Sequence, residues 1–135
     1  MVEVWFYLLP DATEATKQAF IVKFCDTAYR RDRQAVILCN HMAEAEQLDL
    51  AIWGAKPESF IPHSINHECS APLQLLTHAL PNQGDLLLNL TDQLLTVTDY
   101  QRIVEIINPE SRDASRSRWR HYKDQGLTPE LKPIA

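Results

Sequence analysis

Short apolar runs that alternate with stretches of helical periodicity constrain the fold of this chain most strongly. Residues 2–9 and 34–39 are short and apolar, as expected for strands buried on both faces of a sheet. Apolar side chains instead recur at helical spacing between Asp11 and about Arg31, and again in residues 41–53. This order of strand, helix, strand and helix predicts a right-handed parallel βαβ unit.

Residues at the predicted helix ends follow known capping preferences. Asp11 lies three residues before Glu14, which is the spacing of a capping box for the first helix. Asn108 is a good N-cap for the last helix, and Pro109 suits its first turn. Gly126 is a good helix stop, so the last helix is expected to end there.

Three more apolar segments extend the predicted sheet. Residues 72–76, 85–90 and 102–107 each resemble a short buried strand, which gives a mostly parallel sheet of about five strands. We find no linker or internal repeat, so residues 1–135 are expected to form one domain. Two prolines follow the last helix, and the tail from about residue 127 is therefore expected to be irregular.

The scarcity of glycine argues against an enzyme with a nucleotide site. The chain has only 3 glycines, Gly54, Gly84 and Gly126, and neither phosphate-binding glycine motif is present. The nucleophile elbow of α/β hydrolases is also absent. We therefore expect no catalytic residues and no cofactor, although an α/β enzyme with an unrecognised site remains an alternative.

His63, His67 and Cys69 form the one arrangement with metal-ligand chemistry. Three ligands leave a structural zinc site one short, so the alternative is that His63 bonds to backbone and the other two are incidental. The 3 cysteines are widely spaced and favour reduced thiols. With no signal peptide and no apolar run of about 18 residues, we expect a cytoplasmic location and no membrane segment.

Charge is unevenly distributed along the chain, whose net charge is −5. Residues 1–101 hold 6 Lys and Arg against 13 Asp and Glu, whereas residues 102–135 hold 7 against 5. An acidic body is repelled by phosphate backbones, so we expect no direct DNA binding by the protein as a whole. The alternative is a nucleic-acid-binding module that uses the basic C-terminal helix.

Trp53 points away from the core stripe of its predicted helix. At 100° per residue, it lies about 100° from Ile52 and about 140° from Leu48, which face the core. Phe60 follows in a loop between two prolines. Large aromatics outside core positions favour an interface anchor. The alternative is that the two rings pack on each other and cover the sheet edge.

The last helix carries a basic stripe. Relative to Arg112 at zero, the stripe residues lie within about 80° in one direction and about 20° in the other, whereas Arg118 and Tyr122 point elsewhere. The stripe consists of Arg112, Arg116, Trp119, Arg120 and Lys123. Cations around an indole suit a peptide that is both acidic and apolar. The alternative is a merely basic, solvated helix face.

Three segments together resemble a known family. Residues 48–53 and 58–63 read L-D-L-A-I-W and E-S-F-I-P-H, residues 6–9 read F-Y-L-L, and residues 116–123 read R-S-R-W-R-H-Y-K. In this order they resemble the chi subunit of the bacterial DNA polymerase III clamp loader. The matches run from residue 6 to residue 126.

The resemblance implies a three-layer α/β/α sandwich, Rossmann-like but without a phosphate loop, in a non-catalytic accessory subunit. It implies that the psi subunit binds at Trp53, Pro57 and Phe60. It further implies that the acidic C-terminal tail of single-stranded DNA-binding protein binds at Arg112, Arg116, Trp119, Arg120 and Lys123. A helicase-like repair protein is a further partner that the resemblance suggests.

Overall fold

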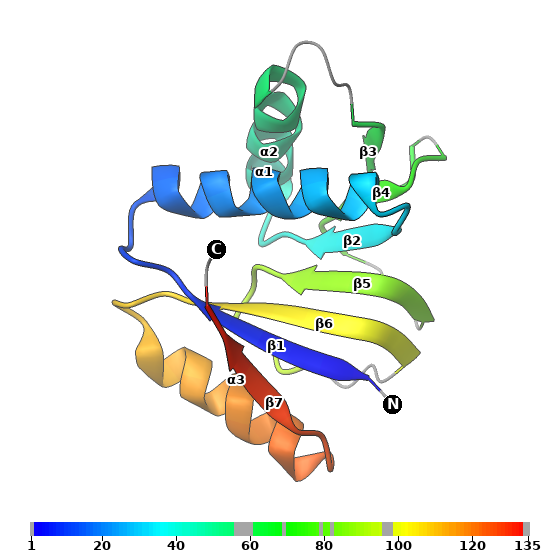
Figure 1. Ribbon diagram of the computed structural model, residues 1–135. Helices are drawn as coiled ribbons and strands as arrows, with labels where there is room; N and C mark the ends of the chain where they lie inside the picture. Colours follow the sequence, from blue (N-terminus) through cyan, green and yellow to red (C-terminus); the bar gives the residue numbers. More distant parts are fainter. Residues whose placement is uncertain are drawn as a thin grey trace.

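Seven parallel strands form one sheet with helices on both faces (Figure 1). The computed structural model describes residues 2–55, 61–68, 70–78, 80–81, 83–95 and 99–133. Within these residues the strand order is β3-β4-β2-β5-β6-β1-β7, and each described pair is parallel. The predicted class, a three-layer α/β/α sandwich, is therefore confirmed, but the sheet has seven described strands and not about five.

The first four elements alternate between strand and helix, as the sequence predicts, and four consecutive strands then precede the last helix. In order, the elements are β1 (Glu3–Leu8), α1 (Glu14–Arg30), β2 (Ala35–Leu38), α2 (Met42–Ala55), β3 (His63–Ile65), β4 (Leu73–Leu76), β5 (Gln83–Asn89), β6 (Asp99–Ile107), α3 (Arg112–Asp124) and β7 (Pro129–Lys132). In the described part of the chain, none of the helices combines the length and the apolar character that a membrane span requires.

The two strands that the sequence did not predict lie at the two edges of the sheet. The prediction of an irregular tail was wrong, because β7 pairs with β1 from Val4 to Tyr7. Pro129 begins β7, and a proline is tolerated at the first residue of an edge strand because no ladder hydrogen bond is lost there. At the other edge, the side chain of Asn66 bonds to the backbone N and hydroxyl of Thr77, which holds β3 against β4.

Helix α1 begins later than the sequence predicts. Its N-cap is Thr13, whose hydroxyl accepts a hydrogen bond from the backbone N of Thr16 at 3.2 Å. Asp11 instead accepts from the backbone N of Thr13 at 2.9 Å, which forms a local turn before the helix. The predicted capping box between Asp11 and Glu14 was therefore wrong, because the Asp11 carboxylate bonds to Thr13 and Thr13 is itself the N-cap.

Helix α3 also begins later, with Ser111 as its N-cap. The side chain of Asn108 accepts from the backbone N of Glu110 at 2.9 Å, so Asn108 closes a turn and not the helix. The C-terminal prediction is confirmed. Gly126 follows the helix with a φ of 83°, and the N of Leu127 bonds back to the carbonyl of Tyr122.

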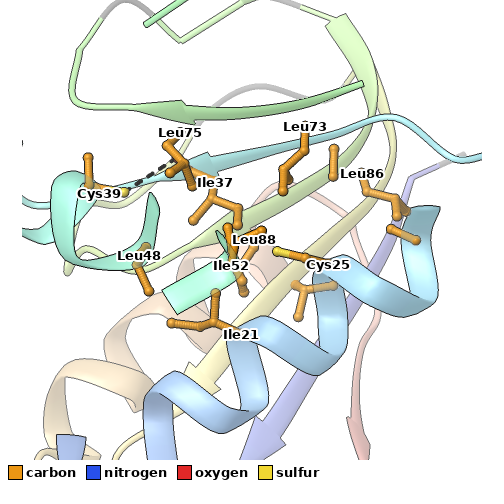
Figure 2. Close-up of a cluster of buried hydrophobic side chains, with 14 of the residues drawn as sticks. Ile21, Cys25, Ile37, Cys39, Leu48, Ile52, Leu73, Leu75, Leu86 and Leu88 are labelled. Atoms are coloured by element: carbon orange, nitrogen blue, oxygen red, sulfur yellow. Dashed lines mark hydrogen bonds between the residues drawn. The ribbon is translucent and has the colours of Figure 1, made fainter. Parts of the chain in front are cut away.

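The sheet separates two hydrophobic clusters. The first lies under α1 and α2 and includes Ile21 and Cys25 of α1 with Leu48 and Ile52 of α2 (Figure 2). Burial raises the pKa of the Cys25 thiol to about 12, so this cysteine is a neutral, small apolar side chain. The second cluster lies on the face that α3 covers.

Alternation along β1 sends its side chains to both clusters. Phe6 belongs to the cluster under α3, whereas Tyr7 packs against the cluster under α1. The strand lies between β6 and β7, with only the short β7 beyond it. The sheet surface on either side of β1 is therefore available to line grooves beside α1 and α3.

Candidate protein-interaction surfaces

A groove of about 730 Å³ runs between α3 and the edge of the sheet. We call it the α3 groove. All five residues of the basic stripe line it, together with residues of β1, β6 and β7. The lining consists of Phe6, Leu8, Ile107, Arg112, Ser115, Arg116, Trp119, Arg120, Lys123, Asp124 and Leu131. The structure therefore brings the predicted stripe residues together at one concave surface.

The α3 groove has a charged wall and an apolar floor. Its four cations are exposed and come from α3, against one lining carboxylate, that of Asp124. Trp119 packs on Phe6 of β1 with ring centroids 5.0 Å apart, so its indole is fixed as part of the floor. An extended acidic peptide that enters this groove would meet cations on one side and apolar surface below.

Sequence reasoning missed the apolar residues that the sheet contributes to the groove. Leu131 of β7 is 61% exposed and Leu8 of β1 is 40% exposed, and the two line the same groove, where they form an exposed apolar patch beside Trp119. Leu131 was missed because the tail was expected to be irregular. The signal available in the sequence was the alternation of Pro129, Leu131 and Pro133 with polar residues, which is the period of a strand.

A buried polar network holds α3 on the sheet. Arg118 is buried, and its Nε donates to the Glu105 carboxylate of β6 at 2.8 Å. Tyr122 donates its hydroxyl to the same carboxylate at 2.6 Å, and the Asn89 side-chain amide donates at 3.0 Å. Arg118 and Tyr122 thus point away from the basic stripe, as predicted, and their contacts set the rotation of α3 that presents the stripe to the groove.

The Glu105 carboxyl has an unusual environment for an ionisable group. Burial raises its pKa to about 7, and the opposing effects of Tyr122, Arg118 and Asn89 limit that rise. Burial also raises the pKa of the Tyr122 hydroxyl, with the Glu105 charge as a second cause. Tyr122 and Arg118 therefore act together against burial to favour the charged form of the Glu105 carboxyl group.

A second exposed surface lies on α2. Trp53 is 58% exposed and Leu50 is 71% exposed, and the two lie three residues apart on one side of the helix. Sequence reasoning placed Trp53 off the core stripe, which the structure confirms. It missed Leu50, although this leucine lies about 200° from Leu48, which faces the core.

His63 fixes the position of the segment that follows α2. Its Nδ1 lies 2.7 Å from the carbonyl oxygen of Ile61, and its Nε2 lies 2.8 Å from the Asp49 carboxylate on α2. Its ring also packs against Trp53 in a T-shaped arrangement, with ring centroids 5.9 Å apart. The imidazole is thus engaged by oxygen atoms of the chain itself, and its backbone contact is the one predicted as the alternative to zinc binding.

Three residues of the predicted sites, Pro57, Phe60 and Cys69, lie outside the described residues. The structure therefore does not test the predicted pairing of Trp53 with Phe60. Among the residues that are described, no group of three or more metal-ligating side chains gathers.

An α/β fold with exposed aromatic and leucine side chains on two surfaces is typical of small proteins that bind other proteins. Comparison with known proteins agrees with this class and identifies the family. The profile of the family described as "DNA polymerase III chi subunit, HolC" matches residues 1–130. The chain therefore belongs to the chi subunits of DNA polymerase III, which are accessory subunits of a replicative polymerase.

Three curated relatives carry the same description, "DNA polymerase III subunit chi". The protein of Pseudomonas aeruginosa is 33% identical over 131 residues, which cover 93% of this chain and 92% of the relative. The protein of Escherichia coli is 25% identical and covers 90% of this chain and 91% of its own length. The protein of Haemophilus influenzae is 22% identical, with coverage of 90% on both sides.

The fold is shared with a solved structure of much lower sequence identity. The crystal structure of T4 UvsW matches 98% of this chain with a TM-score of 0.65 and 9% identity. The match spans 41% of that longer chain, and it shows similarity of fold alone.

Proposed function

We propose that this chain is a non-catalytic adaptor of the clamp loader that connects two proteins during DNA replication. In this proposal the α3 groove binds the acidic C-terminal tail of single-stranded DNA-binding protein, and the α2 surface around Trp53 binds the psi subunit. The observation that carries the proposal is the composition of the α3 groove, which combines four exposed cations with an apolar floor. Membership of the chi family supports both partners.

The charges of the α3 groove favour an acidic partner that also has apolar side chains. Arginine guanidinium groups form paired hydrogen bonds to carboxylates, and Trp119 and Leu131 offer apolar contact beside them. A phosphate backbone would use the cations but would leave the apolar floor uncovered. The net charge of −5 further disfavours extended contact with nucleic acid.

The α2 surface supports binding of a different partner, since α2 and α3 lie on opposite faces of the sheet (Figure 1). Trp53 and Leu50 are large apolar side chains that expose most of their surface, and such residues anchor interfaces when a partner buries them. Pro57 and Phe60 complete this surface in the proposal, on the basis of the family resemblance. The two partners would then bind without competing.

Arg116→Ala is expected to weaken binding of a synthetic tail peptide by about 1 kcal/mol, or about fivefold, because it removes an exposed charge pair. Wild-type affinity should be micromolar, near −8 kcal/mol, and should fall as salt screens the pairs. Isothermal titration calorimetry at two salt concentrations measures both effects. Arg30→Ala is the matched control, because Arg30 is an exposed arginine on α1 outside the groove.

Several outcomes would contradict the tail-binding part. They are equal losses from Arg116→Ala and Arg30→Ala, an affinity that does not change with salt, and tighter binding of naked single-stranded DNA than of the peptide. Arg118 is unsuitable as a control, since its burial couples its replacement to folding.

Trp53→Ala is expected to weaken binding of the psi subunit by about 1.5 kcal/mol, or about tenfold, because it removes an aromatic anchor. Surface plasmon resonance with purified psi measures this change. Tyr29→Ala removes an exposed aromatic of α1 and serves as the control. Unchanged psi affinity in Trp53→Ala, or equal loss in the control, would exclude the α2 surface.

A further inference from the structure

A second groove lies on the opposite face of the sheet, between α1 and strands β1 and β6. Its volume is about 360 Å³, within the usual range for binding pockets. Four aromatic side chains contribute to its lining: Trp5 and Tyr7 from β1, and Phe20 and Phe24 from α1. We call it the α1 groove. It shares no lining residue with the α3 groove and lies on the other side of β1.

The charged side chains that line the α1 groove are all of one sign. Lys23, Arg31, Arg33 and Arg102 line it, and no carboxylate is among the described residues that do so. Such a concentration is unexpected in a chain whose net charge is −5. Like charges brought together favour an anionic partner.

Two of these cations are held as fixed parts of the wall. The Arg33 Nε donates to both Asp85 oxygens, at 2.7 and 2.9 Å, and Arg102 donates to Glu3 at 2.9 Å. Both carboxylates lie outside the lining. Arg31 instead is exposed at the end of α1 and has no ion pair in the described part of the chain, so its guanidinium is available to a ligand.

The Trp5 indole in the wall of the α1 groove carries a hydrogen-bond donor without a partner among the described residues. The Arg102 guanidinium stacks over its ring at 3.6 Å, which fixes the indole in the groove wall. Its Nε1 is buried and donates to no acceptor among the described residues. A buried donor without an acceptor is costly, so a ligand whose oxygen reaches the Nε1 after a small shift of the groove wall would gain affinity.

We propose that the α1 groove is a second docking site, which binds an acidic peptide segment of a partner protein that inserts one large apolar side chain. The apolar side chain packs among the aromatic residues, and the flanking carboxylates pair with Arg31 and the neighbouring cations. The α1 groove is a different site from the two surfaces of the proposed function, and its binding does not depend on them.

The three tryptophans make the proposal testable in the intact protein, because each belongs to a different surface. Trp5 lines the α1 groove, Trp119 lines the α3 groove and Trp53 lies on the α2 surface. In a ¹⁵N–¹H correlation spectrum the three indole N–H signals therefore report the three surfaces separately. The probe is an acetylated peptide with one phenylalanine between two pairs of glutamates.

Titration with this peptide is expected to move the Trp5 indole signal in a saturable way, whatever happens at Trp119. Arg31→Glu should weaken the affinity measured at Trp5 by about fivefold or more, as expected for reversal of a contacting charge. Arg30→Glu is the matched control, since it makes the same charge change one residue away and outside the groove. Unchanged Trp53 and Trp119 signals show that each variant is folded.

Three results would overturn the proposal. The first is a Trp5 signal that stays unmoved at millimolar peptide. The second is an equal response to a peptide with lysines in place of the glutamates, which would mean that the charges play no part. The third is saturation by phenylacetate as tight as by the peptide, which would make the groove a small-anion site. Failure of this test would not count against the proposed function, because the Trp53 and Trp119 signals report the α2 surface and the α3 groove separately.

Discussion

Replacement of Arg118 by methionine is expected to lower the free energy of unfolding by about 3 kcal/mol at pH 8, because it leaves a buried carboxylate without its cation. Urea denaturation followed by circular dichroism measures this change. Arg30→Met removes an exposed arginine and should stay within about 0.5 kcal/mol of wild type.

The loss should be smaller at pH 6 than at pH 8. The pKa of Glu105 is about 7 in the folded protein, above its ordinary value of 4.5, and removal of Arg118 raises it further. Between pH 4.5 and the folded-state pKa of Glu105, the folded state binds more protons than the unfolded state, so the free energy of unfolding falls as the pH rises. At pH 6 the variant relieves part of its loss by protonating Glu105.

A second substitution tests this explanation. Glu105→Gln in the Arg118→Met background keeps an acceptor for Tyr122 but removes the ionisable group. In the double variant, the loss in free energy of unfolding should therefore be the same at pH 6 and at pH 8. An equal loss at both pH values in Arg118→Met alone, or a total loss below about 1 kcal/mol, would contradict this account of the network.

Trp119→Ala is expected to weaken binding of the tail peptide by about 2 kcal/mol or more, or about 30-fold, because large aromatics at the centre of an interface dominate its energy. The indole forms part of the groove floor and also packs on Phe6, so its removal takes away both contact area and shape. Fluorescence anisotropy of a labelled peptide measures the affinity.

Trp119→Phe and Trp53→Ala complete the comparison. Phenylalanine keeps an aromatic ring above Phe6 and should restore most of the affinity. Trp53→Ala should leave peptide binding unchanged while it weakens psi binding, and Trp119→Ala should do the reverse. If both tryptophan variants lower both affinities, the two surfaces are not independent, and the adaptor proposal loses its basis.

Local sequence patterns predicted the features that depend on local geometry. The helical angles of Arg116, Trp119 and Lys123 follow from 100° per residue, and the structure brings these side chains to one groove. The stop at Gly126 follows from the ease with which glycine adopts a positive φ. Both depend on residues within a few positions of one another.

Features that depend on distant residues were not predicted. The tail forms β7 because β1 offers it an edge to pair with. The short alternation of apolar and polar residues in the tail is a weak signal beside its two prolines, which favour irregular structure. The α1 groove likewise combines residues 5 and 7 with residues 102 and 104. One long-range signal was available: Glu105 lies among apolar residues, between Ile103-Val104 and Ile106-Ile107, and a carboxylate in such a segment requires a buried partner.

The position of β1 within the sheet determines when this strand can pair during translation. β1 precedes every other described element, yet both strands that flank it, β6 and β7, are made after the other four described strands. This apolar strand must therefore remain unpaired at least until β6 has been made, which exposes it to aggregation and to chaperones. The α3 groove also takes its floor from β1 and β7, so a nascent chain gains this peptide-binding groove only after residue 131 has emerged.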